Sequence, residues 1–255
     1  MSNKGKKFRF SRDTFVELLL ALKQAEYRFL SFEDVQGAGV QLGGKSCVLR
    51  HDVDVSMDFA LDMAQLENEL GVRATYFVML RSPLYNLMSR HASERLAQLV
   101  SLGHHIGLHF DAGFVLDSEK DLERELVFEL GVLSDLVGDS IRAFSFHQPS
   151  DKAIRMRVAL PGVINTYNPD QLQEYRYISD SNRVWREVDP FDLIASGMKH
   201  LHILLHPVWW MCSSENVYDC WDQAINRNFE STQIQLLSTE RAFGPARKLV
   251  LTRLS

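Results

Sequence analysis

Two aspartates, Asp52 and Asp54, are the residues of this sequence best placed to do chemistry. They end an apolar run over residues 47–49 that predicts a buried strand, and Ser56 with later apolar residues at helical spacing predicts a helix directly afterwards. Side chains two positions apart on a strand share one face, so both carboxylates project toward the same point. Neighbouring carboxylates repel unless a cation or a shared proton compensates. The pair therefore predicts a metal or acid–base centre.

Ionisable side chains also gather where the other predicted strands end. They are Asp52, Asp54, His109, Asp111, His147, Asp180 and His206. In parallel barrels the carboxyl ends of the strands form the active site. Carboxylates and imidazoles from separate strands suit zinc, iron, cobalt or nickel, with three protein ligands leaving one position open for water.

Each of these residues also has a purely structural interpretation. A single strand-end histidine such as His147 or His206 is often only hydrogen-bonded, and Asp180 could cap a turn. The Trp209-Trp210 pair is more typical of packing than of a platform for a sugar ring. His51 alternates away from Asp52, so we expect it to lie behind the strand.

The elements that must position these residues follow an alternating pattern. Seven strands are predicted, at Ser46–Asp52, Arg73–Leu80, His104–Phe110, Ile141–His147, Val163–Tyr167, Tyr175–Ser179 and His200–His206. Helices are predicted at Met57–Leu70, Ser93–Leu102 and Ser118–Val137, each closed by a glycine, and from a capping box at Thr14-x-x-Glu17 to Ala25. This alternation predicts an α/β fold with a parallel sheet, and the short apolar strands favour a barrel over an open sheet. We expect one domain over residues 1–255, with helices at 14–25 and 215–245 added to its core.

Composition narrows the class of protein. The chain has 255 residues, of which 45% are hydrophobic and 24% charged, as in ordinary globular proteins. A net charge of −5 without a basic stripe argues against a nucleic-acid partner. Three cysteines, none in a CxxC pair, argue against a disulfide framework and fit a reducing compartment. Charged residues interrupt the apolar run near the N-terminus, and no stretch is long enough to cross a bilayer, so we expect a cytoplasmic protein.

Four motifs occur in a characteristic order along the chain. They are the aspartate pair, Gly-His-x-Ile-Gly-x-His at 103–109, a proline-containing strand end at 147–149 and Leu-x-His at 204–206. Together they resemble the polysaccharide deacetylases of the NodB-homology group, carbohydrate esterase family 4, over about residues 46 to 210. The His-Asp-Val-Asp form is similar to a branch linked to surface-polysaccharide and O-antigen biosynthesis.

The resemblance implies a distorted (β/α)7 barrel of the NodB-homology type and a divalent metal, zinc first, with cobalt, nickel or iron as alternatives. It implies that Asp52 is the general base, that Asp54 and His109 are metal ligands and that His206 is the general acid. Val53 between the aspartates leaves open an exchange of the base and ligand roles.

Two family positions differ in this chain. The second ligand histidine of the family would fall at Gly113, and Gln148 stands where the family has an arginine. Either His147 or Asp111 could take the vacant ligand place, and the softness of imidazole favours His147 for zinc. Candidates for substrate binding are Asp111, Asp180, Trp209 and Trp210.

The sequence therefore predicts a metal-dependent hydrolase that removes N-acetyl groups from an amino sugar in surface-polysaccharide or O-antigen biosynthesis. The partner would be an N-acetylated sugar that is nucleotide-linked, lipid-linked or polymeric, and the oligomeric state is open. One alternative is hydrolysis of another amide by an allantoinase-like enzyme. Another is a catalytically inactive glycan-binding homologue, which the missing histidine and arginine would explain.

Overall fold

The strands of this protein form one curled parallel sheet. The computed structural model describes residues 8–38, 43–114, 119–155, 158–168, 170 and 172–239. Its eight described strands are β1 (Tyr27–Phe29), β2 (Lys45–Val53), β3 (Thr75–Val78), β4 (His105–Asp111), β5 (Ala143–His147), β6 (Ile164–Asn165), β7 (Arg176–Ser179) and β8 (His200–Leu205). They follow the order β6-β5-β4-β3-β2-β8-β7, with β1 beside β2. No pairing joins β6 to β7 in the described part of the chain, so the barrel is open on that side. The predicted distorted (β/α)7 barrel is confirmed.

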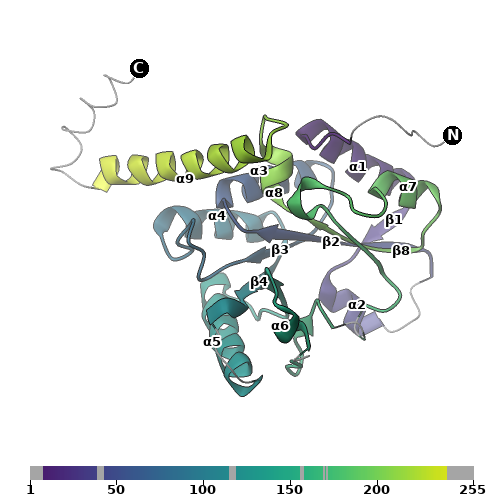
Figure 1. The fold of residues 1–255 in the computed structure, drawn as a ribbon, viewed down its shortest axis with the longest axis horizontal. Coiled ribbons are helices and arrows are strands. Elements are labelled where there is room, and N and C mark those ends of the chain that lie inside the picture. Colours follow the sequence, from purple (N-terminus) through teal and green to yellow (C-terminus); the bar gives the residue numbers. More distant parts are fainter. Residues whose placement is uncertain are drawn as a thin grey trace.

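Helices cover the outer surface of the sheet (Figure 1). The α-helices are α1 (Arg12–Gln24), α2 (Phe32–Ala38), α3 (Met57–Glu69), α4 (Arg90–Ser101), α5 (Glu119–Val137), α6 (Asp151–Arg155), α7 (Pro190–Ala195), α8 (Pro207–Met211) and α9 (Val217–Thr239). Short 3-10 turns occur at Ala112–Phe114 and Ser181–Arg183. The long α9 packs on α3, α4 and α8, and its C-terminal end extends beyond the sheet (Figure 1).

The seven predicted strands and four predicted helices are all present, with small differences at their ends. β1 is an additional strand, and its three residues are too few to give an alternating pattern. The predicted capping box at Thr14 is wrong, because Ser11 is the N-cap and its hydroxyl accepts a hydrogen bond from the Thr14 N–H at 3.2 Å. The predicted helices at 215–245 correspond to α9, and residues 240–245 lie outside the described part.

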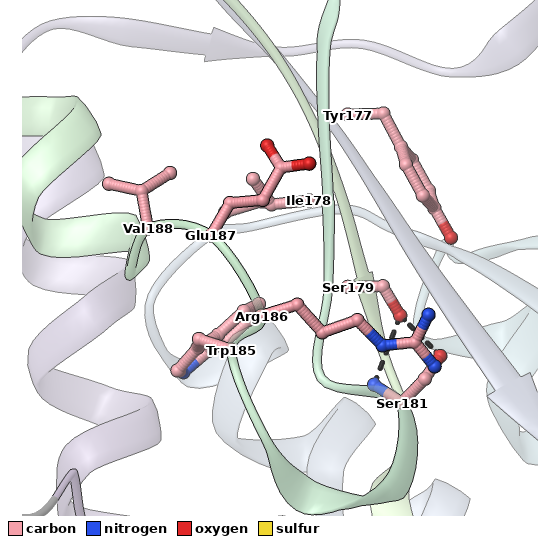
Figure 2. A pocket seen from close by; sticks show the side chains of 8 residues that line it. All are labelled: Tyr177, Ile178, Ser179, Ser181, Trp185, Arg186, Glu187 and Val188. Atoms are coloured by element: carbon pink, nitrogen blue, oxygen red, sulfur yellow. Dashed lines mark hydrogen bonds between the residues drawn. The ribbon is translucent and has the colours of Figure 1, made fainter.

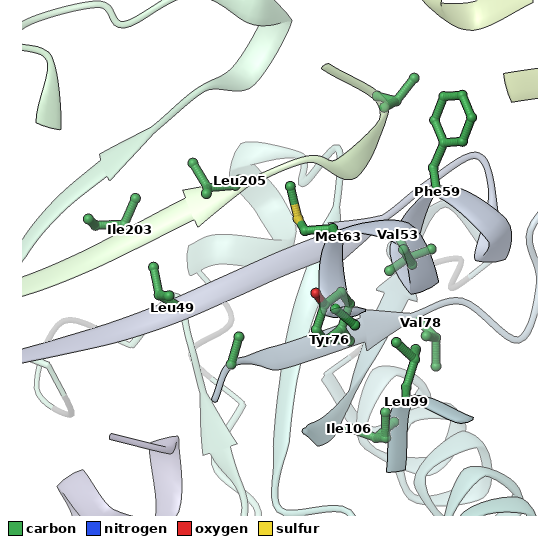
Figure 3. Packing of buried hydrophobic residues seen from close by; sticks show 14 of the residues in the cluster. Leu49, Val53, Phe59, Met63, Tyr76, Val78, Leu99, Ile106, Ile203 and Leu205 are labelled. Carbon is green, nitrogen blue, oxygen red and sulfur yellow. The ribbon is translucent and has the colours of Figure 1, made fainter. Parts of the chain in front are cut away.

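Strand β2 has two different buried faces (Figure 3). Leu49 and Val53 point outward, where they join a cluster with Phe59 and Met63 of α3 and Leu99 of α4. Full burial of one such side chain contributes about 1.5–3 kcal/mol, so this layer holds the helices against the sheet. The alternate residues of β2 point into the barrel.

A second apolar cluster lies inside the barrel. It contains Phe32, Val48, Phe77, Ala143 and Ile164, and Phe32 brings α2 against the strands. Gly107 is required beside this cluster, because a Cβ there would lie only 2.5 Å from Cε1 of Phe77.

One disulfide joins Cys212 to Cys220, with their Cα atoms 5.2 Å apart. The cysteine count argued against a disulfide framework and gave no sign of this single bridge, which forms because the turn between α8 and α9 brings the two residues together. Cys47 is free and buried. None of the described helices is long and apolar enough to span a membrane.

Candidate metal and acid–base site

Three predicted side chains meet at the carboxyl ends of neighbouring strands. Asp54 follows β2, His109 lies in β4 and His147 ends β5. Nε2 of His109 lies 3.1 Å from Oδ1 of Asp54, and Nδ1 of His147 lies 3.5 Å from the same oxygen. The two imidazole nitrogens are 3.3 Å apart. One donor atom from each residue therefore faces a common point.

These donor atoms fit a small divalent cation. Ligand atoms at 2.0–2.1 Å from a tetrahedral zinc are about 3.4 Å apart, close to the three separations observed. Oδ1 of Asp54 is buried and has no hydrogen-bond partner, as expected for an atom that binds an ion. Nδ1 of His109 lies 2.7 Å from the Ser145 hydroxyl, and such a contact orients a ligand imidazole with its other nitrogen free for the metal.

The charges of this cluster support ligand chemistry. Burial alone would raise the pKa of Asp54, but its contacts with His109 and His147, and the charge of His206, lower that pKa well below the usual range. The contact with Asp54 raises the pKa of His147, although burial opposes the shift. The carboxylate is thus ionised, and a metal would compete with protons for the His147 imidazole.

Asp52 lies beside this cluster and is held by Arg50. Nε and Nη2 of Arg50 donate to the two oxygens of Asp52 at 2.8 and 2.7 Å, in a two-pronged ion pair. Oδ2 of Asp52 is 3.6 Å from Nε2 of His109. Burial raises the pKa of Asp52, but the charges of Arg50 and His109 outweigh it and lower that pKa. Asp52 is therefore a fixed, ionised carboxylate.

Arg50 is a site residue that the sequence-based analysis missed. Its guanidinium lies between the rings of Phe77 and Tyr167, at 5.2 and 5.4 Å, and Nη1 donates to the Thr166 hydroxyl at 3.1 Å. The family resemblance implies an arginine at position 148, where this chain has Gln148. In this structure Arg50, from β2, is the arginine that contacts Asp52. Alternation could have revealed it, since Arg50, Asp52 and Asp54 share one strand face.

His206 faces the cluster from the end of β8 and is held by Asp180. Nδ1 of His206 lies 2.5 Å from Oδ1 of Asp180, whose other oxygen accepts hydrogen bonds from the His206 backbone N–H at 3.0 Å and from Trp210 Nε1 at 2.7 Å. Burial would lower the pKa of His206, but Asp180, with Asp54 and Asp52, raises it to about 9. Nε2 of His206 lies 3.9 Å from Oδ2 of Asp54. The arrangement can supply a proton to the same point that the three donor atoms face.

The candidates for substrate binding lie in less accessible positions. Asp180 is fully buried and contacts His206 rather than solvent. Trp210 is fully buried against aromatic residues, and Trp209 is 5% exposed, so neither indole presents an open face to a sugar. Oδ1 of Asp111 accepts the Gly113 N–H at 2.8 Å, and Asp111 does not belong to the three-donor cluster.

Comparison with known proteins gives a likeness of structure but not of sequence. No family model and no curated protein matches the sequence. A deacetylase from Streptococcus pyogenes, solved in complex with acetate, superposes with a TM-score of 0.50 and 15% identity, over 78% of this chain and 92% of that one. This chain has the polysaccharide deacetylase fold.

Two further solved structures are similar at lower scores. One is the CE4 domain of a multidomain xylanase from the hindgut metagenome of Trinervitermes trinervoides, with a TM-score of 0.43 and 17% identity over 76% of this chain and 85% of that one. The other is the chitin deacetylase of Colletotrichum lindemuthianum, with a TM-score of 0.44 and 13% identity over 71% of this chain and 81% of that one.

Proposed function

We propose that this protein is a metal-dependent hydrolase that removes N-acetyl groups from an amino sugar in surface-polysaccharide or O-antigen biosynthesis. The observation that carries the proposal is the convergence of Asp54, His109 and His147 on one point, between an ionised Asp52 and a His206 that holds its proton. The polysaccharide deacetylase fold supports the same chemistry.

Asp54, His109 and His147 are the residues that would hold the ion. When bound there, a divalent ion would lower the pKa of a water molecule and polarise the acetamide carbonyl. Asp54 supplies the charge, and Ser145 fixes the His109 ring in its place.

Asp52 is the general base in this proposal. Its carboxylate accepts a proton from the water that attacks the acetamide carbon, and Arg50 keeps both of its oxygens in position. Because Arg50 holds the pKa of Asp52 low, its carboxylate is ionised and can accept a proton over a wide pH range. The same low pKa makes it a weak base.

His206 is the general acid. Its Nδ1 contacts Asp180, so its Nε2–H is the proton directed toward the site, and this proton is donated to the nitrogen that leaves as an amine. A positioned general acid contributes about 10²–10⁴-fold to such a reaction. Without it the nitrogen would have to leave as an anion.

The proposal is tested by measuring acetate release from N-acetylated amino sugars together with the metal content of the purified protein. We expect about one divalent ion per chain and release of acetate that is lost on chelation. Asp52→Asn should abolish release and keep the ion, whereas Asp139→Asn, at an exposed aspartate, should change neither. Sugar binding without acetate release, unaffected by Asp52→Asn, would instead favour a glycan-binding protein.

A second comparison tests the third ligand. His147→Ala should lose the ion, while Asp111→Ala should retain it, because of these two residues only His147 directs a donor atom at Asp54. The opposite result would assign the ligand role to Asp111.

A further inference from the structure

A separate pocket of about 220 Å³ lies beside β7 (Figure 2). Its polar and aromatic lining comes from β7 and the loop that follows, through Tyr177, Ser179, Ser181, Trp185, Arg186 and Glu187. Pockets that enclose a whole drug-sized ligand measure about 300–1,000 Å³, so this one has room for part of a substrate.

This pocket adjoins the proposed catalytic residues through Tyr177, which also lines a second space together with Arg50, the partner of Asp52. Ser179 and Ser181 flank Asp180, the residue that holds His206. Their hydroxyl oxygens are 2.6 Å apart, and the Ser179 hydroxyl accepts the Ser181 N–H at 3.1 Å. A group bound against these serines would lie beside the two chain neighbours of the residue that holds the proposed acid.

Arg186 and Glu187 are the two charged side chains that line this pocket. Glu187 is occupied by an ion pair with Arg176. Arg186 is exposed and has no hydrogen bond or ion pair within the described residues, and its side chain extends toward Ser179 and Ser181 (Figure 2). One guanidinium and two hydroxyl groups thus border the same space.

The loop that carries Arg186 is held in an unusual conformation. Asn182 and Arg183 have φ angles of 59° and 58°, in the left-handed region, which costs about 1–3 kcal/mol per residue and persists only where the surroundings enforce it. Here Nη2 of Arg183 donates to the carbonyl oxygens of Ser214 at 2.6 Å and Phe10 at 3.2 Å. The base of the loop is therefore fixed, and Arg186 is presented from a rigid support.

We propose that this pocket binds a phosphate group attached to the amino sugar, so that the substrate is a phosphate-linked sugar and not a polymer. Guanidinium and hydroxyl groups are typical phosphate ligands, because both donate hydrogen bonds and the guanidinium adds charge. The aromatic rings of Tyr177 and Trp185 can contact the part of the substrate next to the phosphate. This inference rests on the proposed function, since it names the class of amino sugar that reaches the site.

The test compares four forms of N-acetylglucosamine. They are the free sugar, the sugar phosphorylated on its anomeric hydroxyl, the UDP-linked sugar and the polyprenyl-diphosphate-linked sugar. Binding is measured by calorimetry and acetate release in parallel, on the metal-loaded protein. The variants are Arg186→Gln and Arg186→Lys, and Arg90→Gln on α4 serves as the matched exposed arginine. Comparison of the two diphosphates distinguishes a nucleotide carrier from a lipid carrier.

We expect the phosphorylated forms to bind at least about tenfold more tightly than the free sugar, as for a hydrogen bond to a charged group. Arg186→Gln should remove that advantage, Arg186→Lys should restore part of it and Arg90→Gln should leave it unchanged. Equal binding of free and phosphorylated sugars by the unmodified protein would overturn the inference, as would an advantage that survives Arg186→Gln. The proposed function fails separately, if no form releases acetate while the phosphate-dependent binding persists.

Discussion

Strand β2 places a buried cluster of acids and histidines on each of its two faces, and the clusters differ in how the oxygens of their carboxylates are paired. Each cluster has one buried polar atom without a hydrogen-bond partner, Nδ1 of His51 on the outer face and Oδ1 of Asp54 on the inner face. On the outer face, Glu67 contacts Nε2 of His51 at 2.6 Å and accepts the Tyr76 hydroxyl at 2.7 Å. His104 accepts the Ala74 N–H at 3.3 Å, with its other ring nitrogen 3.1 Å from the Ala64 carbonyl oxygen. Both oxygens of the buried carboxylate on this face are thus satisfied within the protein.

The inner face is built differently. Asp54 directs an oxygen without a hydrogen-bond partner toward two imidazole nitrogens, and both Asp54 and His147 are partly accessible. A buried carboxylate without its partners is costly, so a protein that retains this arrangement requires a cation or proton to complete it. The comparison indicates that a buried carboxylate behind a strand serves stability when both its oxygens are bonded, whereas an unpaired carboxylate oxygen at a strand end is available to an ion.

The largest expected effect is a difference in acetate release between a variant on the inner face of β2 and a variant on its outer face. Asp54→Ala should remove the bound ion and lower acetate release by about 10³-fold or more, because a metal supplies several kcal/mol of stabilisation to developing charge. The checks are elemental analysis and an acetate assay. Glu67→Gln, on the outer face, should retain both ion and activity; loss of the ion in that variant would contradict the division.

A reciprocal effect on stability is expected from the outer face. Glu67→Ala removes the carboxylate to which His51 and Tyr76 are bonded, and leaving a buried polar group without its partner costs about 1–3 kcal/mol. Urea denaturation of the metal-free protein should show this loss. Asp54→Ala should cost less under the same conditions, because Asp54 is partly exposed and its Oδ1 accepts no hydrogen bond, so only its ionic contacts with His109 and His147 are lost.

The proposed general acid on the inner face, His206, should determine how activity depends on pH. The pKa of His206 is raised to about 9 because Asp180 more than offsets burial, and the ring must be protonated to act. Activity should therefore be present below that pKa and fall as pH rises through it. Asp180→Asn removes the charge, so the falling limb should move to lower pH and the maximal rate should drop by about 10²-fold. An unmoved limb would exclude Asp180 as the partner of the acid.

Much of this arrangement is predictable from the sequence, because parallel strands bring their carboxyl ends to one edge. That rule alone places Asp54, His109 and His147 together, although they are far apart in the chain. The contact between Asp180 and His206 was not predicted, because it depends on β7 pairing with β8, and strand order is not encoded in a local pattern. Arg50 was missed because it interrupts an apolar run and no strand-end rule covers it.

The orientations of Trp209 and Trp210 could not be predicted for a related reason. They lie in α8, which has only five residues and gives no helical periodicity to show which face is buried. The structure places Trp210 against Phe10 and Phe15, where its Nε1 supports Asp180. Its contact with the candidate site is therefore through Asp180, which also contacts His206.

The smallest expected effects come from a matched pair of hydroxyl deletions, one on each face. Ser145→Ala removes the contact to Nδ1 of His109, and loss of such support costs about 10–100-fold in metal affinity. Tyr76→Phe removes one hydrogen bond to Glu67 and should cost about 1–3 kcal/mol of unfolding free energy while metal affinity stays constant. Metal titration and urea denaturation of both variants provide the measurements. Because each change deletes one buried hydroxyl, a similar loss of metal affinity in the two variants would mean that the faces of β2 are coupled, and the distinction between a structural and a chemical cluster would fail.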